Sequence, residues 1–112
     1  MKIAIASRNG KELDTHLGKS NSMYIYEFDE VENKSEFLEH RNIEIDLESK
    51  HQSQKIIKAL EDCDVIISVK YGPKSGIYAK ELNIKLVEDE GTIEEALKRY
   101  TNHVIFIKNV KI

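Results

Sequence analysis

The feature that most constrains the fold is the order in which two hydrophobic periodicities follow one another. Apolar residues alternate, as in strands, over residues 2–7 and 23–29 and, with charges interleaved, over about 36–45. From about Leu47 the spacing changes to the helical period, and helical stretches then alternate with short strand-like runs. The pattern therefore predicts three strands first, and then strands separated by helices.

The second half of the chain begins with a helical face formed by Ile56, Ile57 and Leu60. The β-branched run at 64–69, "DVIISV", predicts a short buried strand. Pro73 suits the first position of a helix that extends to about Leu82. A further strand is expected at 84–88, "IKLVE".

The clearest local signal lies in "GTIEEALKRY". Thr92 followed three residues later by Glu95 is a capping box, which marks a helix start. The predicted buried stripe of this helix comprises Ile93, Ala96, Leu97 and Tyr100. The final run at 103–112, "HVIFIKNVKI", has a strand-like composition and predicts a last strand.

This order of elements restricts the architecture. Strands separated by helices pair in parallel through right-handed crossovers, whereas the first three, with "EVENKS" as a hairpin turn, can pair antiparallel. The prediction is an α/β fold with a mixed five-stranded sheet in the order 3-2-1-4-5 and helices packed on it. With 112 residues, the chain is expected to form a single domain over 1–112.

Composition narrows the classes of partner. The net charge of −3 argues against a nucleic-acid-binding protein that neutralises phosphates. The only cysteine, Cys63, allows no intrachain disulfide and no multi-cysteine metal motif. The strand pattern begins directly at the N-terminus and no apolar run reaches the length of a membrane span, so we expect a cytoplasmic protein without a signal peptide or membrane association.

The connection between the first two strands is unusually long and polar. It uses residues 7–21, whereas most connections in compact domains take only a few residues. In the predicted sheet, the ends of the first and fourth strands lie side by side and the connections that leave them diverge, which is where open α/β sheets bind ligands. The loop after the fourth strand, "YGPKSG", leaves the same edge. The topology therefore predicts a ligand-binding crevice between these two loops.

Two long stretches carry a resemblance to a known family: "MKIAIAS" through "LDTHLGKSNSMYIYEFD", and "CDVIISVKYGPKSGIYAKELNIKLVEDEGTIEEALKRY". Their order and content resemble the dinitrogenase iron–molybdenum cofactor biosynthesis and binding domain family. The resemblance implies a ribonuclease H-like fold and a role in carrying or inserting an iron–sulfur-based metallocofactor. Two features depart from the family pattern: Leu17 replaces a phenylalanine, and Val69, Lys70 and Tyr71 add bulk and charge to a loop that is often glycine-rich.

Within that motif, His16 is the candidate metal ligand. A neutral imidazole can bind iron or molybdenum when its second nitrogen has an orienting partner, and Asp14 could supply that carboxylate. Gly18 could provide positive φ or close backbone approach. Equally open are a solvated loop histidine and a simple turn glycine. Further polar side chains that could contact an anionic cofactor, or simply be solvated, are Ser7, Arg8, Asn9, Lys11, Lys19, Ser20 and Asn21.

The second loop adds a helix start. Backbone N–H groups after Gly72 and Pro73 would favour an anion, and Lys74 and Ser75 would add a positive charge and a hydroxyl. Such a helix start is common in α/β proteins and is weak evidence alone.

The remaining metal-binding residue types receive no role. Cys63 lies between Asp62 and Asp64, which raise the pKa of a thiol, so we expect a buried structural cysteine. His40, His51 and His103 are expected in an edge strand, a helix and a strand start, without a second ligand at metal spacing.

Three functions remain to be compared. The favoured one is a non-enzymatic carrier of an iron–molybdenum cofactor-like or iron–sulfur cluster, with cofactor-assembly proteins as possible partners. A nuclease is improbable because the first strand, "KIAIAS", has no acidic residue for metal-dependent cleavage. The alternative is a small regulatory module that binds another anion or a protein partner in the same crevice, without a metal cofactor.

Overall fold

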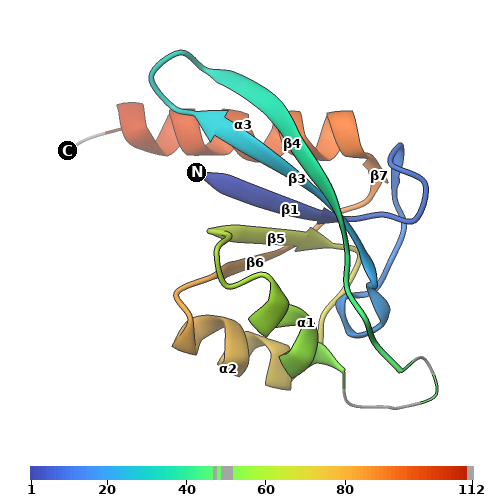
Figure 1. Ribbon diagram of the computed structural model, residues 1–112. Helices are drawn as coiled ribbons and strands as arrows, with labels where there is room; N and C mark the ends of the chain where they lie inside the picture. The colour runs from blue at the N-terminus through green and yellow to red at the C-terminus, as the bar shows by residue number, and fades with distance from the viewer. Residues whose placement is uncertain (47, 49–51, 111–112) are drawn as a thin grey trace.

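The fold is a mixed five-stranded β-sheet with three helices (Figure 1). The computed structural model describes residues 1–46, 48 and 52–110. The strands of the main sheet are β1 (Lys2–Ala6), β3 (Ser22–Asp29), β4 (Lys34–Asn42), β5 (Val65–Ser68) and β6 (Lys85–Glu88). The helices are α1 (Ser53–Ala59), α2 (Pro73–Glu81) and α3 (Ile93–Asn109). A second sheet pairs β2 (Glu12–Leu13) with β7 (Gly91–Thr92), and η1 (Leu17–Lys19) is a 3₁₀ turn.

The strand order is β4-β3-β1-β5-β6, which confirms the predicted order 3-2-1-4-5. β3 pairs antiparallel with both β1 and β4, whereas β5 pairs parallel with both β1 and β6. The α/β class and the mixed sheet are therefore confirmed. β1 and β5 occupy the centre of the sheet, and the chain leaves their carboxyl ends through the two loops that were expected to form a crevice.

The core has two layers because the sheet is covered on both faces. α1 and α2 lie together on one side of the sheet, and α3 lies on the other (Figure 1). In β1, Ile3, Ala4, Ile5 and Ala6 are all fully buried, which explains why this strand is apolar at every position. In α1, Ile56, Ile57 and Leu60 are buried as predicted. Leu47, where the helical period was expected to begin, lies outside the described residues.

Helix α3 confirms one prediction and contradicts another. Thr92 and Glu95 form both hydrogen bonds of the capping box, and the predicted stripe is buried. The last strand expected at 103–112 is wrong: α3 continues to Asn109, and 111–112 lie outside the described residues. No glycine or proline interrupts the chain after the cap, so the helix continues through β-branched residues despite their strand propensity. Tyr100 and Val104 extend the core-facing stripe at helical spacing.

Helix α2 ends in a defined cap. Asn83 has a φ of 58°, its N–H donates to the carbonyl of Lys80, and the N–H of Ile84 donates to the carbonyl of Ala79. This is the Schellman arrangement, in which an asparagine or glycine takes the left-handed conformation. It turns the chain directly into β6. None of the helices within the described residues has the length and apolar character that crossing a membrane requires.

Candidate functional site

The long loop after β1 is folded along most of its length. β2 pairs with β7, so that Glu12 is the register partner of Thr92 and Leu13 that of Gly91. The N–H of Ile93 donates to the carbonyl of Lys11, which attaches the loop to the first residue of α3. Leu13 and Leu17 are buried in the core. The loop is therefore held by backbone pairing and by two apolar anchors.

Two predicted site residues, Ser7 and Asn9, shape this loop from within. The Asn9 Oδ1 accepts hydrogen bonds from the N–H groups of Lys11 (2.9 Å) and Glu12 (3.0 Å). The Ser7 hydroxyl is fully buried, and its oxygen accepts from the N–H of Gly10 at 3.0 Å. Both side chains are thus used in local turns. Their role as cofactor contacts stays a prediction that these bonds do not support.

The two loops meet around His16. The N–H of Val69 donates to the carbonyl of Thr15 (3.1 Å), and the N–H of Leu17 donates to the carbonyl of Lys70 (2.9 Å). These bonds involve the residues on either side of His16 and fix its backbone against the loop that follows β5. The side chain of His16 is exposed. The topology-based expectation that the loops converge therefore agrees with the structure.

The backbone of His16 is held further by the turn that it starts. Its carbonyl accepts from the N–H of Lys19 (3.1 Å) and from the hydroxyl of Ser20 (2.9 Å). Ser20 is fully buried, so its hydroxyl supports the turn from below and does not face a ligand. The backbone of His16 is consequently fixed, whereas its imidazole is exposed.

Within the part of the chain that the structure describes, the hydrogen bonds of the Asp14 carboxylate go to Thr15 and Arg8 and not to His16. Its carboxylate accepts from the hydroxyl of Thr15 (2.7 Å) and from the N–H of Arg8 (3.2 Å), and the Arg8 guanidinium lies 3.5 Å away. Partial burial acts to raise the pKa of Asp14, but the bonds from Thr15 and Arg8 outweigh it and hold that pKa below its usual value. The carboxylate therefore stays ionised and braces the loop, a role different from the one the sequence suggested.

The loop glycine with positive φ is Gly10, which the sequence reasoning did not single out. Its φ is 78°, and a Cβ there would lie 2.8 Å from the ring of Tyr24. Gly18, the predicted position, does not have positive φ, and its Cβ would meet nothing within 4 Å. The prediction of positive φ at Gly18 is thus wrong. The two glycines differ because Tyr24 of β3 lies against Gly10, whereas nothing lies close to Gly18.

The start of α2 agrees only in part with expectation. Pro73 is the first helical residue and Gly72 the N-cap, with no side chain capping the helix. Lys74 is exposed, whereas Ser75 is only 3% exposed. The Ser75 hydroxyl therefore faces the interior, and Lys74 remains as the side chain able to meet an anion.

The remaining cysteine and histidines behave as follows. Cys63 is buried, and desolvation together with the nearby Asp62 carboxylate raises the pKa of its thiol to about 12. It is therefore a structural residue, as predicted. His40 lies in β4 as expected, stacks on Tyr24 and bonds to Ser22 (2.7 Å). His103 lies within α3, so the strand start predicted there is wrong. His51 lies outside the described residues.

The side chains able to bind a metal limit which kind of metal group fits the crevice. Among the described residues, no three histidine, cysteine or acidic side chains gather closely enough to hold a metal ion. A bare ion would need such a set. Iron–sulfur clusters are usually held by cysteine thiolates, so a cluster in the crevice would have to bring terminal ligands of its own. The exposed side chains that the two loops offer to such a group are His16 and the lysines Lys11, Lys19, Lys70 and Lys74.

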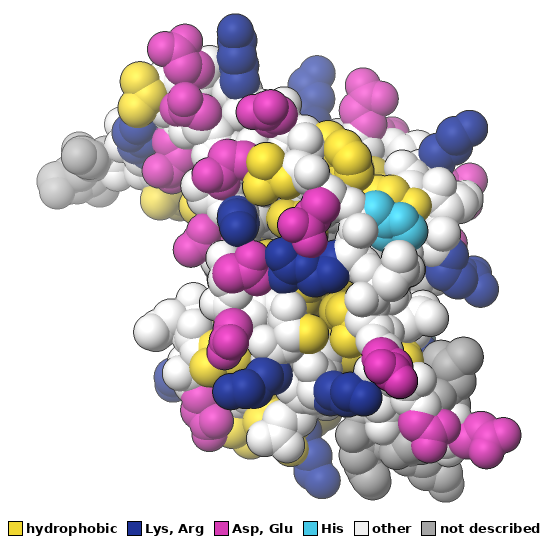
Figure 2. All heavy atoms as spheres, in the orientation of Figure 1, with side chains coloured by type: hydrophobic (Ala, Val, Ile, Leu, Met, Phe, Trp, Pro, Cys, Tyr) yellow, Lys and Arg dark blue, Asp and Glu magenta, His cyan; other side chains and the backbone are white. Residues whose placement is uncertain are grey.

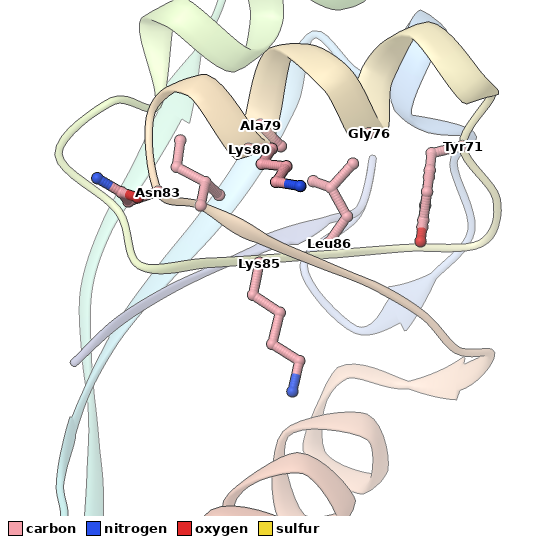
Figure 3. A pocket seen from close by; sticks show the side chains of 8 residues that line it. Tyr71, Gly76, Ala79, Lys80, Asn83, Lys85 and Leu86 are labelled. Atoms are coloured by element: carbon pink, nitrogen blue, oxygen red, sulfur yellow. The ribbon is translucent and has the colours of Figure 1, made fainter.

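The charges of the rest of the surface are mixed. On the face seen in Figure 2, basic and acidic side chains are interspersed without a large field of one sign. A distinct hollow lies at the far edge of the sheet, between α2 and β6 (Figure 3), with a volume of about 370 Å³. Another, of about 420 Å³, lies between the Gly10 turn and the start of α3.

The fold has relatives among solved structures. The apo form of the orange protein from Desulfovibrio gigas is 18% identical, with a TM-score of 0.71 and coverage of 91% of this chain and 88% of that one. A Methanocaldococcus jannaschii protein provisionally assigned as a dinitrogenase is 17% identical, with a TM-score of 0.63 and coverage of 92% and 89%. A Thermotoga protein provisionally assigned as NifB is 15% identical, with a TM-score of 0.58 and coverage of 90% and 87%.

At these identities the structural matches establish the fold alone. A search of curated proteins gave no match. The family description "dinitrogenase iron-molybdenum cofactor" matches residues 1–103, a range that includes both loops and the capped start of α3. The chain therefore belongs to the dinitrogenase iron-molybdenum cofactor family.

Proposed function

We propose that this protein binds an iron–sulfur-type metallocofactor, or its precursor, without catalysing a reaction. The binding place is the crevice between loop 7–21 and loop 69–72, and His16 is the protein ligand. The bound group is iron–molybdenum cofactor-like or an iron–sulfur cluster, and the partners are proteins of cofactor assembly. The single cysteine, which forms no intrachain disulfide, is compatible with a reducing cytoplasm.

One observation supports this proposal most directly. Thr15 and Leu17 are each hydrogen-bonded to the facing loop, so the intervening His16 presents its imidazole from a fixed backbone. A ligand held in place before binding loses less conformational entropy when the cluster arrives. Family membership supports a cofactor-related role.

The test is an anaerobic titration of the protein with a synthetic iron–sulfur cluster that has exchangeable thiolate ligands, followed by visible absorption. We expect His16→Ala to weaken binding by a factor of about ten or more, the range found when a ligand or its support is removed. His103→Ala is the matched control because His103 is exposed on α3, away from both loops. Equal affinity of wild type and His16→Ala would remove His16 from the site.

The alternative is an anion-binding module without a metal. The exposed Lys74 beside the uncapped start of α2 favours it. It predicts that phosphate or molybdate alone raises the melting temperature and that Lys74→Ala abolishes this shift. If the oxyanions stabilise the protein and the cluster does not bind, the alternative replaces the main proposal.

A further inference from the structure

The edge strand β6 and the hollow beside it form a surface separate from the crevice. β6 has β5 as its only neighbour in the described sheet, so one side of its backbone is unpaired. The N–H of Lys85 donates to Asp64 and the N–H of Asp89 donates to Ser68, both toward β5. Because backbone direction alternates along a strand, Leu86 and Glu88 point their N–H and C=O groups outward.

The hollow lies directly beside this open edge. It is formed by α2, the turn into β6 and the loop after β5 (Figure 3). In Figure 3, Leu86 is directed toward α2, whereas Lys85 extends to the opposite face, toward α3. Its lining residues are Tyr71, Gly76, Ala79, Lys80, Asn83, Ile84, Lys85 and Leu86. The apolar floor and the strand backbone thus lie next to each other.

Charge and shape indicate the occupant. The residues that line the hollow include Lys80 and no acidic residue, and the Lys85 side chain extends to the opposite face of β6. Gly76 faces the hollow from the middle of α2, and a Cβ there would meet nothing within 4 Å. A glycine inside a helix lowers stability, and here it leaves this part of the wall of the hollow without a side chain. An extended segment that places acidic and apolar side chains alternately would match both features.

We propose that β6 receives an extended, acidic peptide segment of a partner protein by β-strand addition. The segment pairs with the outward backbone groups of Leu86 and Glu88. Its apolar side chains enter the hollow over Ala79 and Ile84, and its acidic side chains, which alternate to the opposite face, meet Lys85. In this mode of recognition, main-chain bonds and a side-chain pocket act together.

The surface is connected to the crevice through one residue pair. The N–H of Tyr71 donates to the Glu88 carboxylate at 3.1 Å, and the preceding Lys70 accepts from Leu17. A segment paired along β6 would therefore contact the strand that anchors the loop beside His16. The peptide site itself does not depend on cluster binding, and it is tested with cluster-free protein.

The probe is a fluorescein-labelled peptide of alternating glutamate and leucine, measured by fluorescence polarisation. The first variant is Gly76→Leu, which fills the hollow at a position with free space and is expected to fold. The second is Lys85→Glu, which reverses the charge on the face that the acidic side chains meet. We expect each to weaken binding by a factor of about ten or more, as for truncated or reversed hot-spot contacts. Lys55→Glu, an exposed lysine of α1, is the control and is expected to bind like wild type.

Backbone pairing has its own readout. On peptide addition, the amide hydrogens of Leu86 and Glu88 should exchange more slowly with solvent, whereas those of exposed residues in β4 should not change. A peptide that is methylated at alternate backbone nitrogens cannot form the pairing hydrogen bonds, so it should not slow the exchange of these two amides.

Several results would contradict the proposal. These are no binding of the peptide by wild type, unchanged binding by Gly76→Leu and Lys85→Glu, or equal binding of a lysine–leucine peptide. If the peptide-free protein dimerises and Gly76→Leu abolishes the dimer, a second copy of the chain occupies this edge instead. Circular dichroism of each variant identifies any loss of binding caused by misfolding.

Discussion

At the scale of single residues, the loop beside His16 depends on Gly10. Its positive φ turns the chain back over the sheet, and its missing side chain lets the backbone contact the ring of Tyr24. That ring stacks in turn on His40 in β4, with ring centroids 4.2 Å apart and planes 7° from parallel. One glycine therefore links the candidate loop to Tyr24 in β3 and, through that ring, to the edge strand β4.

We expect Gly10→Ala to lower the free energy of unfolding by about 1–3 kcal/mol, because the new methyl group meets the Tyr24 ring and alanine is strained at positive φ. Gly18→Ala is the matched control. Its φ is not positive and its surroundings are open, so we expect a change within about 0.5 kcal/mol. Urea unfolding of both variants measures the difference. Similar free energies of unfolding for Gly10→Ala and Gly18→Ala would show that the Gly10 turn accepts a side chain without strain.

At the scale of elements, α3 and the small β2–β7 sheet form one unit. Thr92 is the last residue of β7, the register partner of Glu12, and the N-cap of α3. Its hydroxyl oxygen accepts from the N–H of Glu95 at 3.1 Å, and the Glu95 carboxylate accepts from the N–H of Thr92 at 3.2 Å. The start of the helix and the outer part of the candidate loop are therefore fixed by the same residue.

We expect Thr92→Ala to reduce the free energy of unfolding by about 1 kcal/mol, because a helix N–H loses its cap. Thr92→Ser keeps the hydroxyl and should retain most of the stability. Chemical denaturation measures both, and hydrogen exchange at Ile93 reports whether the loop loosens with the cap. Equal losses in the alanine and serine variants would mean that the threonine methyl group, and not the cap, is responsible.

At the scale of the whole molecule, Arg41 connects the outer strand β4 to the end of α1. Its guanidinium donates to both carboxylate oxygens of Asp62, at 2.7 and 3.0 Å, and also to the carbonyl of Ala59 and to Glu39. The bonds from Arg41 hold the pKa of Asp62 well below its usual value, although partial burial opposes them. The sheet edge and the helical layer are thereby joined across a long sequence separation.

This pair predicts a pH dependence of stability. Because the pKa of Asp62 is lower in the folded than in the unfolded state, its contribution is complete above the unfolded value of about 4 and is lost as the pH falls further. Urea unfolding at pH 7 and pH 3 should therefore show that the free energy of unfolding falls less between these two pH values for Asp62→Asn than for wild type. Glu44→Gln, at an exposed position, should behave like wild type. An identical pH dependence in all three proteins would contradict this role.

Much of the fold was predictable because its signals are local or topological. The capping box at Thr92 depends on residues three apart, and the strand order follows from which strands are separated by helices. The error at 103–112 has a physical reason. β-branched residues favour strands only where a neighbouring strand can pair with them, and here an established helix continues through them instead.

The candidate site was predictable in position but not in detail. The topology indicated that the loop after the first strand and the loop after the fourth strand would meet, and the bonds around His16 agree with that. The partners of Asp14, the burial of Ser75 and the exchange of roles between Gly10 and Gly18 depend on contacts between distant segments. No sequence period encodes such contacts. The metal-binding roles assigned in this loop remain predictions.

The sequence by itself determined the α/β class, the order of the strands and the start of α3, because hydrophobic period, capping and crossover chirality act through the chain's own connectivity. Tertiary structure alone decided which polar side chains of the loop after β1 face solvent and which brace it. Burial and hydrogen bonding there depend on Tyr24, Val69 and Lys70, which other strands and loops supply. The backbone bonds of Thr15 and Leu17 fix the chain on both sides of His16, and its side chain is exposed.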